Sequence, residues 1–388
     1  MPEVSAVGAV APAQLILWDD DPGVESPDYL AQQLVTYIGN KRALVPHIAA
    51  AVDRVKQRLG KRKLRILDAF SGSGAVSRFF KGHCCSLISN DIEAFAAVVG
   101  RCYLRNADPS AMRELGDIVQ DLNRMVDVVP FKPGFIEELY APRDEGSITI
   151  EDRVFYTRQN ARRLDNYRRL IDTVPSEYHD LLLGPLISEA SVHANTAGVF
   201  KGFYKDRRTG IGKFGGTNGD ALARIKGEIR LELPVTSRHR CEVAVFQEDA
   251  NKLVRTVRGL DLAYLDPPYN QHPYGSNYFM LNLLVDYRRP LRISKVSGIP
   301  ADWQRSNYNV RSRCAHRLRD LVHSLDAPFV LVSFSSEGFI SFHQIQRMLQ
   351  ELGRVDVIET RYNTFRGSRN LRERSIHLTE RLFLLERR

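Results

Sequence analysis

The sequence predicts an α/β protein with a Rossmann-like, open and mostly parallel sheet, and three observations favour this fold class. An apolar run over 64–70 leads into a glycine turn at 71–74 that opens a helix. A second apolar run, 85–91, ends in an acid about twenty residues further on. A third run, 260–265, leads into Asp266-Pro267-Pro268-Tyr269, where two prolines forbid any further ladder or helix. The carboxyl ends of such strands are where ligands bind in an open parallel sheet.

Composition limits the class of protein. The chain has 388 residues, of which 43% are hydrophobic and 26% charged, which fits a globular protein with one large core or two. Its formal net charge of +9 favours a polyanionic partner without identifying it. The five cysteines have neither disulfide-like nor C-x-x-C spacing, which predicts reduced thiols and no structural metal site. No apolar run is long enough for a bilayer and no export signal is recognisable, so a cytoplasmic protein is expected.

The start of the chain, residues 1–28, has neither a helical nor a strand period, and we expect a loosely ordered leader there, with order beginning near Tyr29. A segment from Tyr37 to Arg42 then precedes a helix. Its apolar positions fall on one face, namely Ile48, Val52, Val55 and Leu59. Lys41 stands just before this helix, where it either projects toward an anionic group or is an ordinary solvated lysine.

The strand, glycine turn and helix that follow one another from residue 64 let the backbone approach a ligand closely. Gly72 and Gly74 supply the turn, although one G-x-G is a weak signal by itself. Asp91 strengthens the signal, because an acid at the end of the second strand hydrogen-bonds a ribose in such folds. It is a better candidate than Glu93, and the alternative is that it caps the next helix.

The middle of the chain is predicted to be helical and loop-rich from about 100 to 190 and basic from 191 to 240. The arginines between 152 and 170 either contact phosphates or form a solvated helix face. Between 199 and 240, ten Lys and Arg stand against four Asp and Glu, interleaved with glycine and aromatic residues. A flexible basic loop or hairpin with aromatic tips suits an element that enters a nucleic-acid groove. Its candidate contacts are Lys201, Lys205, Arg207, Arg208 and Lys213.

The sheet pattern resumes in the last third of the chain. A strand over 243–246 is followed by Asp249 at a helix start, and another buried strand is expected over 329–334. The segments 355–358 and 376–385 read as a closing pair, of which the last is an antiparallel partner. The sequence has no internal repeat, so one catalytic unit is expected.

In their order these motifs resemble the Dam-like, alpha-group DNA adenine methyltransferases, and among them the modification enzymes of type II, particularly type IIS, restriction systems. The similarity runs from about Tyr37 to the C-terminus. The matching segments are the first cofactor motif at 37–41, the glycine motif at 68–74, the ribose motif at 90–93, the adenine-side motif at 249–250 and the catalytic Asp-Pro-Pro-Tyr at 266–269. Asp68 departs from the Dam branch, which commonly has glutamate there, and this bears only on which branch is nearer.

This resemblance implies a class I methyltransferase fold with a seven-stranded, mostly parallel sheet and an inserted target-recognition region. The catalytic domain would comprise 29–100 and 241–388, and 101–240 would form the insertion. S-adenosylmethionine is the implied methyl donor, with Lys41 and the glycine turn around its methionine end, Asp91 on its ribose and Asp249 near its adenine amine. The implied cofactor-binding residues are Tyr37, Lys41, Asp68, Phe70, Gly72, Gly74, Asp91, Asp249 and Asp266.

The expected chemistry rests on residues 266–269. The exocyclic amine of adenine is a poor nucleophile because its lone pair is delocalised into the ring, and Asp266 and the Pro267 carbonyl would each accept one of its N–H groups. Because this amine is inaccessible inside a duplex, the base must be flipped out, and Tyr269 would stack on it. The further candidate DNA contacts are His272, Tyr274, Asn277, Arg366 and Arg369.

The expected partners are double-stranded DNA and a companion restriction endonuclease that acts on the same site without forming a stable complex, in the cytoplasm of a bacterial cell. The nearest alternative is the same chemistry on RNA adenine or on the N4 amine of cytosine, although cytosine enzymes more often resemble Ser-Pro-Pro-Tyr. A nucleic-acid-binding protein that keeps the fold without turnover is a further alternative. Every expected catalytic position is nevertheless occupied in this sequence.

Overall fold

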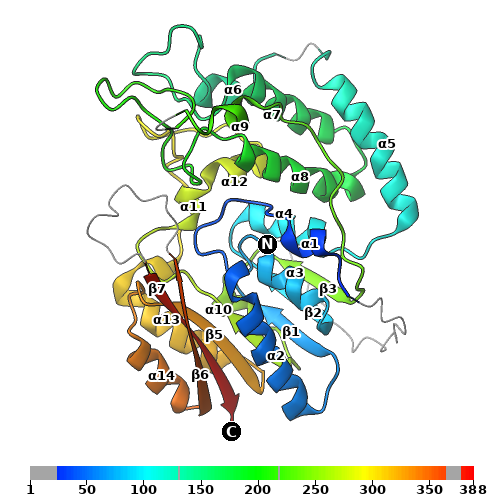
Figure 1. The fold of residues 1–388 in the computed structure, drawn as a ribbon, viewed down its shortest axis with the longest axis vertical. Coiled ribbons are helices and arrows are strands. Elements are labelled where there is room, and N and C mark those ends of the chain that lie inside the picture. The colour runs from blue at the N-terminus through cyan, green and yellow to red at the C-terminus, as the bar shows by residue number, and fades with distance from the viewer. Residues whose placement is uncertain (1–23, 130–131, 217–218, 364–376) are drawn as a thin grey trace, which may run out of the picture.

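The computed structural model of the protein describes residues 24–129, 132–216, 219–363 and 377–388 (Figure 1). Within them one sheet has the strand order β3-β2-β1-β4-β5-β7-β6. Its strands are β1 (Leu64–Asp68), β2 (Cys84–Asn90), β3 (Glu242–Phe246), β4 (Leu262–Leu265), β5 (Phe329–Ser335), β6 (Gly353–Asn363) and β7 (His377–Arg387). In this sheet β7 alone runs opposite to the other strands, so its pairings with β5 and β6 are antiparallel and the remaining pairings are parallel. The predicted fold class, a seven-stranded and mostly parallel sheet with an antiparallel closing pair, is therefore confirmed.

The strand order places a ligand site between β1 and β4. From β1 the chain builds outward through β2 and β3 on one side, whereas β4 pairs with β1 on the other side. In open α/β sheets the crevice outside the carboxyl ends of the strands at such a reversal binds ligands. Asp68, the last residue of β1, lies in register with Ser89 and Tyr264, so the three carboxyl ends are level. Asp266 follows β4 directly at this edge.

Helices cover both faces of the sheet because its central strands are apolar on both sides. Successive residues of a strand point to opposite faces, so Leu262 and Tyr264 belong to one buried cluster and Ala263 and Leu265 to the other. The first cluster is covered by α2 (Val45–Leu59) and α3 (Ala75–Lys81), and the second by α10 (Ala250–Leu253), α13 (Arg311–Ser324) and α14 (Phe342–Gln350). The helices on the two faces bury the central strands up to their carboxyl ends.

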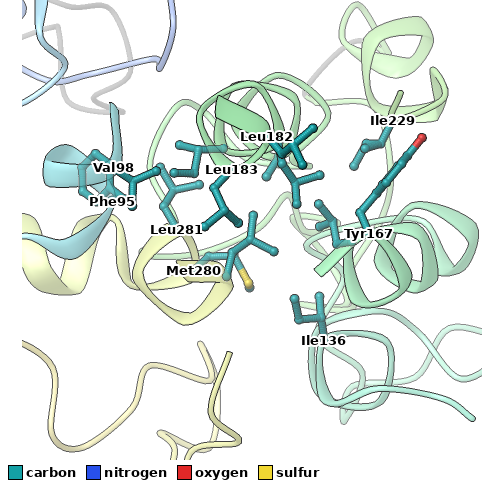
Figure 2. Close-up of a cluster of buried hydrophobic side chains, with 14 of the residues drawn as sticks. Phe95, Val98, Ile136, Tyr167, Leu182, Leu183, Ile229, Met280 and Leu281 are labelled. Carbon is teal, nitrogen blue, oxygen red and sulfur yellow. The ribbon is translucent and has the colours of Figure 1, made fainter. Parts of the chain in front are cut away.

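A separate helical region, drawn above the sheet in Figure 1, has its own core. It comprises α4 (Ala94–Tyr103), α5 (Pro109–Met125), α6 (Phe135–Tyr140), α7 (Arg158–Ile171), α8 (His179–Val192) and α12 (Phe279–Asp286), and the short helices of the chain are α1 (Pro27–Ala31), α9 (Leu222–Lys226) and α11 (Tyr274–Asn277). Figure 2 shows Leu182 and Leu183 among side chains that include Met280 and Leu281. Helix α12 thus packs into the helical region from outside 101–240, and the predicted division into domains stays a proposal.

Acidic residues and main-chain carbonyls bind the arginines between 152 and 170. Arg158 and Arg162 both donate to the buried Glu137. Arg163, only 2% exposed, forms ion pairs with Asp127 and Glu228. Arg163 is thus a buried structural residue, whereas Arg158 and Arg162 are 44% and 55% exposed and fit the solvated helix face; a phosphate contact stays a prediction.

Near the N-terminus the described chain begins at Val24, so most of the predicted leader lies outside the described residues. Helix α1 starts at Pro27, two residues before the expected start of order. The arginine side chain of Arg78 donates to the carbonyls of Tyr29 and Gln32, which fixes this first helix on the sheet domain. Among the described helices, none combines the length and the apolar character that crossing a membrane requires.

Candidate active site

A buried charge network surrounds Asp266, at the carboxyl end of β4. The ammonium nitrogen of Lys41 lies 3.2 Å from Asp266 Oδ1 and 3.0 Å from Glu380 Oε1. The Ser333 hydroxyl donates to the same Glu380 oxygen at 2.6 Å. Lys41 is 4% exposed and Glu380 is fully buried. The Lys41–Asp266 contact is an ion pair without good hydrogen-bond geometry, so Asp266 Oδ1 keeps hydrogen-bonding capacity for another donor.

This network sets the protonation of its members. Burial raises the pKa of Asp266 to about 7, and Lys41 opposes this effect while Glu380 adds to it. Burial alone would lower the pKa of Lys41, but the carboxylates of Asp266 and Glu380 raise it well above its ordinary value. Lys41 is therefore a cation, and Asp266 titrates near neutral pH. An acid that titrates there and faces a ligand cleft is typical of a catalytic position.

Tyr269, on the loop that begins at Asp266, has its ring turned toward the protein interior. Its ring lies 5.7 Å from the ring of Phe334, and Lys41 Nζ is 5.5 Å from its centroid. Its main-chain oxygen accepts a hydrogen bond from the Phe339 amide at 2.7 Å. Burial raises the pKa of Tyr269 to about 12, so the phenol is neutral. The ring is 8% exposed, and it is thus fixed beside Asp266 before any ligand binds.

A cavity of about 660 Å³, counted with its open mouth, lies in front of Asp266 and Pro268. Its walls are formed by Tyr37, Ala69, Phe70, Asn90, Asp91, Ile92, Glu93, Glu248, Asp249, Ala250, Asp266, Pro268, Tyr274, Gly275, Gln304, Ser306, Tyr308 and Asn309. Five acids and no Lys or Arg stand among these described lining residues. The cavity therefore suits a cationic ligand and disfavours one rich in phosphate.

The glycine turn lies against Tyr37 and Asp91, two residues that line this cavity. Gly72 has a φ of +51°, and a Cβ there would lie 2.8 Å from the ring of Tyr37. Its amide donates to Asp91 Oδ2 at 2.8 Å, and Asp91 Oδ1 accepts from the Glu93 amide at 2.9 Å. Asp91 thus holds the turn and the start of the next segment, and it also faces the cavity. Gly74, with a φ of +75°, begins α3 behind it.

Asp68 lies behind the glycine turn and does not line the cavity. It is fully buried, and the Ser77 hydroxyl donates to its Oδ2 at 2.6 Å. Burial raises the pKa of Asp68 to about 7. Lys41, Gly72 and Gly74 are likewise outside the lining, so among the nine predicted cofactor residues only Tyr37, Phe70, Asp91, Asp249 and Asp266 line the cavity.

Three tyrosines stack beside the turn. The Tyr37 ring centroid lies 4.9 Å from those of both Tyr274 and Tyr278, which are themselves 6.1 Å apart, so the three nearly parallel rings form a triangular cluster. The Tyr274 hydroxyl donates to the Ile38 carbonyl at 3.1 Å, and Tyr278 accepts from the Ile38 amide at 2.7 Å. Tyr274 was predicted to contact DNA, but it lines the cavity as part of this stack. The stack explains why the first cofactor motif and the segment after Tyr269 lie together.

Two other predicted DNA contacts differ in exposure. Asn277 is 2% exposed, and its carbonyl accepts from the Phe200 amide at 2.7 Å. A direct DNA contact by Asn277 is therefore wrong for this structure, because its side chain is enclosed. His272 is exposed at the start of the same segment. Arg366 and Arg369 lie outside the described residues.

Asp249 already has several partners at the far end of the cavity. Its Oδ1 accepts from the Asn251 amide at 2.9 Å, which caps α10, and Arg317 donates to it at 2.8 Å. Another part of the cavity wall comes from a segment that sequence analysis missed, namely Gln304, Ser306, Tyr308 and Asn309. The Asn309 amide donates to the Asn270 carbonyl at 2.7 Å and ties this wall to the catalytic loop. Its run of Ser, Asn and Tyr gave no local signal of a ligand site.

The basic loop predicted between α8 and α9 contains a short hairpin, with Lys205 bridged to Gly212. Lys201, Arg207 and Arg208 are exposed, whereas Lys205 and Lys213 are half-buried. The expectation of aromatic tips is wrong, because Phe200 and Phe203 are 2% and 6% exposed and belong to the core of the helical region. Lys205 lies over the Phe203 ring at 4.9 Å. The hairpin thus exposes basic side chains, and the buried rings of Phe200 and Phe203 attach the adjoining segment to the helical region.

A sheet of this strand order, with an acidic cavity and an Asp-Pro-Pro-Tyr loop at its carboxyl edge, defines a Rossmann-like DNA methyltransferase. Residues 37–295, which are 259 of the 388, match the family model of the D12 class N6 adenine-specific DNA methyltransferases. The chain belongs to this family.

Similar proteins extend over most of the chain. It is 27% identical over 361 residues to the type II methyltransferase M.NlaIII of Neisseria lactamica, a match that covers 91% of this chain and 99% of that protein. It is 26% identical over 340 residues to the type II methyltransferase M.CviAII of Paramecium bursaria Chlorella virus 1, covering 86% and 93%. It is also 26% identical over 372 residues to the modification methylase StsI of Streptococcus sanguinis, covering 91% of this chain and 52% of that protein.

Proposed function

We propose that this enzyme transfers a methyl group from S-adenosylmethionine to N6 of adenine at a specific site in duplex DNA, after flipping the base. The observation that carries the proposal is the buried Asp266, which has Lys41 at 3.2 Å and stands at the mouth of an acidic cavity. The family supplies the reaction, and the site residues below are proposals about how this chain performs it.

The cavity fits S-adenosylmethionine. Its lining has five acids and no Lys or Arg, which suits a donor whose sulfonium and amino group are positive. Asp91 lies at the end of β2, where an acid hydrogen-bonds ribose hydroxyls in this fold. Asp249 and Tyr308 stand at the end assigned to the adenine ring. When bound, the donor supplies an electrophilic methyl group on sulfur.

Asp266 and Pro267 act on the nucleophile. The Asp266 carboxylate and the Pro267 carbonyl each accept one N–H of the adenine amine, which favours a tetrahedral nitrogen with its lone pair aimed at the methyl group. The prolines keep this loop extended, so the two acceptors stay at a fixed separation. Lys41 keeps Asp266 ionised, and Glu380 holds Lys41 from the opposite side at 3.0 Å.

The DNA side of the proposal involves the helical region. Tyr269 offers an aromatic face beside Asp266 for the extruded base, and His272 lies at the surface of the following segment. Lys201, Arg207 and Arg208 are exposed and would contact phosphates. We assign the target-recognition region to 101–240 on this basis.

The relatives support a biological setting. M.NlaIII is named a type II methyltransferase and StsI a modification methylase, and both come from bacteria. We propose that this chain is the modification component of a bacterial restriction-modification system, acting in the cytoplasm. A companion endonuclease would share its recognition site without a stable complex.

The proposal is tested by transfer of a labelled methyl group from S-adenosylmethionine to duplex DNA. Asp266→Ala should lose transfer while retaining cofactor and DNA binding. Asp261→Asn is the matched control, because Asp261 lies at the other end of the same strand and pairs with Lys61 at 2.6 Å. Full activity in Asp266→Ala would refute the assignment, and label in RNA or in cytosine would favour the alternative substrates.

A further inference from the structure

A second hairpin, residues 288–300, follows α12 and has no role in the site described above. The Ser294 amide donates to the Ile299 carbonyl at 2.8 Å, and the Ala301 amide donates to the Arg292 carbonyl at 3.0 Å. An isolated bridge joins Ile293 and Pro300. These bonds make the segment an ordered hairpin and not an open loop.

Contacts with the helical region hold the 288–300 hairpin in place. The Tyr140 hydroxyl donates to the Gly298 carbonyl at 2.9 Å, and Arg153 donates to the Lys295 carbonyl at 3.1 Å. Gly298 has a φ of +69°, and a Cβ there would lie 2.7 Å from the Tyr140 ring. Arg153, one of the arginines considered above as a phosphate contact, therefore serves to anchor this hairpin.

The outer side of the hairpin is basic and carries two exposed apolar residues, Val296 in the turn at its tip and Leu291 at its base, before the Ile293–Pro300 bridge. Its four charged residues, Arg288, Arg289, Arg292 and Lys295, are all basic and exposed. Arg289 pairs with Glu138, whereas Arg292 and Lys295 form no ion pair with any described residue. Leu291 is fully exposed at 101%, the highest value among the exposed large hydrophobic side chains described. This leucine, directly before the unpaired Arg292, is left uncovered by the residues that the structure describes.

The 288–300 hairpin and the Lys205–Gly212 hairpin share one support. A Cβ on Gly210 would lie 3.7 Å from Ile150, itself 64% exposed, and Arg153 follows three residues later. In Figure 1 the yellow segment after α12 and the green segment between α8 and α9 both extend from the same end of the helical region. The two basic hairpins thus belong to one face.

We propose that the 288–300 hairpin is a second DNA-contacting element of this enzyme, with Arg292 and Lys295 on phosphates and Leu291 as an apolar wedge against the base steps. This inference rests on the proposed function. Charge decides the occupant, because a face with unpaired basic residues and no acid in the hairpin is complementary to a polyanion. Apolar side chains placed between base steps unstack them and distort the duplex, which favours base extrusion. Phosphate contacts by Arg292 and Lys295, which follow Leu291 in the sequence, would help to fix its register.

The charge arm of the test measures DNA affinity against salt concentration, on a duplex carrying the site that the wild-type enzyme methylates. Each phosphate contact contributes about 0.9 to the slope of log affinity against log salt. Arg292→Gln with Lys295→Gln should lower the slope by about 2, and Arg207→Gln with Arg208→Gln serves as the comparison on the first hairpin. Arg62→Gln with Arg113→Gln is the control, because both residues are exposed, Arg62 between α2 and β1 and Arg113 on α5, and Figure 1 draws these elements away from the two hairpins.

The wedge arm uses Leu291→Ala, with 2-aminopurine in place of the target adenine to report extrusion. We expect affinity to fall roughly tenfold, which is about 1.4 kcal/mol, and the fluorescence increase to shrink, with an unchanged salt slope. Val128→Ala is the control, since Val128 is 73% exposed beyond the end of α5. All variants lie at the surface, and near-identical melting temperatures would confirm that they fold.

Three results would overturn the inference. They are an unchanged slope in the double variant, binding and extrusion by Leu291→Ala equal to those of Val128→Ala, and a change of oligomeric mass in place of a change in DNA binding. In each case the inference fails while methyl transfer by the wild-type enzyme leaves the proposed function standing. Absence of methyl transfer by the wild type would instead refute the proposed function.

Discussion

The ammonium nitrogen of Lys41 lies 3.2 Å from Oδ1 of Asp266, and the two residues are brought together from the segment before α2 and from the end of β4. Lys41, the last residue of the first cofactor motif, therefore contacts Asp266 directly. It does not itself line the cavity, whereas Tyr37 of the same motif does. Since burial raises the pKa of Asp266 to about 7 and Lys41 counteracts it, activity should depend on this lysine as a charge.

The first prediction concerns Lys41→Met. Below a pH of about 7 Asp266 binds a proton and can no longer accept an N–H of the adenine amine as a carboxylate, so wild-type kcat should fall as the pH drops through this value. Removing the cation favours the protonated acid, and the acidic limb of the kcat profile should move up by roughly one pH unit or more. Lys61→Met, which breaks the Lys61–Asp261 pair, should leave the limb unchanged. An unmoved limb in Lys41→Met would contradict this role.

Glu380→Gln should act in the opposite direction. Glu380 raises the pKa of Asp266 by like-charge repulsion, so its neutralisation should move the acidic limb to lower pH. The amide can still accept from Ser333, which preserves the packing of this fully buried position. A loss of kcat without a shift of the limb would indicate a structural role only, since a mere packing defect does not change the titration of Asp266.

A prediction on stability concerns Glu93. Burial raises the pKa of Glu93 from 4.5 to about 8, Asp91 adds to this, and the hydrogen bond from Asn282 opposes it. The native state thus binds the proton more tightly, and the stability that Glu93 contributes is complete below pH 4.5 and lost as the pH rises through about 8. Glu93→Gln resembles the protonated acid, so it should raise the melting temperature by a few degrees at pH 9 and little at pH 5. The exposed Glu232→Gln should show no such difference.

Gly72→Ala tests the glycine turn. Its φ of +51° and a Cβ 2.8 Å from the Tyr37 ring mean that alanine must displace Tyr37 from its stack. We expect S-adenosylmethionine to bind at least about tenfold more weakly. Gly60→Ala is the matched control, because Gly60 has a φ of +63° and nothing within 4 Å of an added Cβ. It should cost about 1–2 kcal/mol in stability and leave cofactor affinity, measured by calorimetry, unchanged.

Local patterns predicted the sheet and the order of the motifs, because each strand is a short apolar run that is followed by a distinctive turn. The run before Asp266 is fully buried over Leu262–Leu265, and the glycine turn begins α3 as expected. Such features depend on residues close together in the sequence. The strands and the turns that follow them could therefore be predicted without tertiary information.

Features that depend on distant pairing were not predictable. Glu380 reaches Lys41 only because β7 runs antiparallel to β5, with Glu380 in register with Ser335. Its local sequence indicates a strand with an acid in it and nothing more. Likewise Tyr274 was placed on DNA because its stack with Tyr37 joins residues far apart in the chain. The acidic partners of the arginines of α7 could not be predicted for the same reason, since they lie on other segments.

The most direct test of the central claim is base-resolution mapping of modified bases in DNA from a methylation-deficient host that expresses the wild-type enzyme or Asp266→Ala. The account predicts N6-methyladenine at one defined sequence with the wild type and none with Asp266→Ala. Absence of methyladenine with the wild type, modified cytosine in its place, or the same methyladenine pattern from both proteins would contradict it.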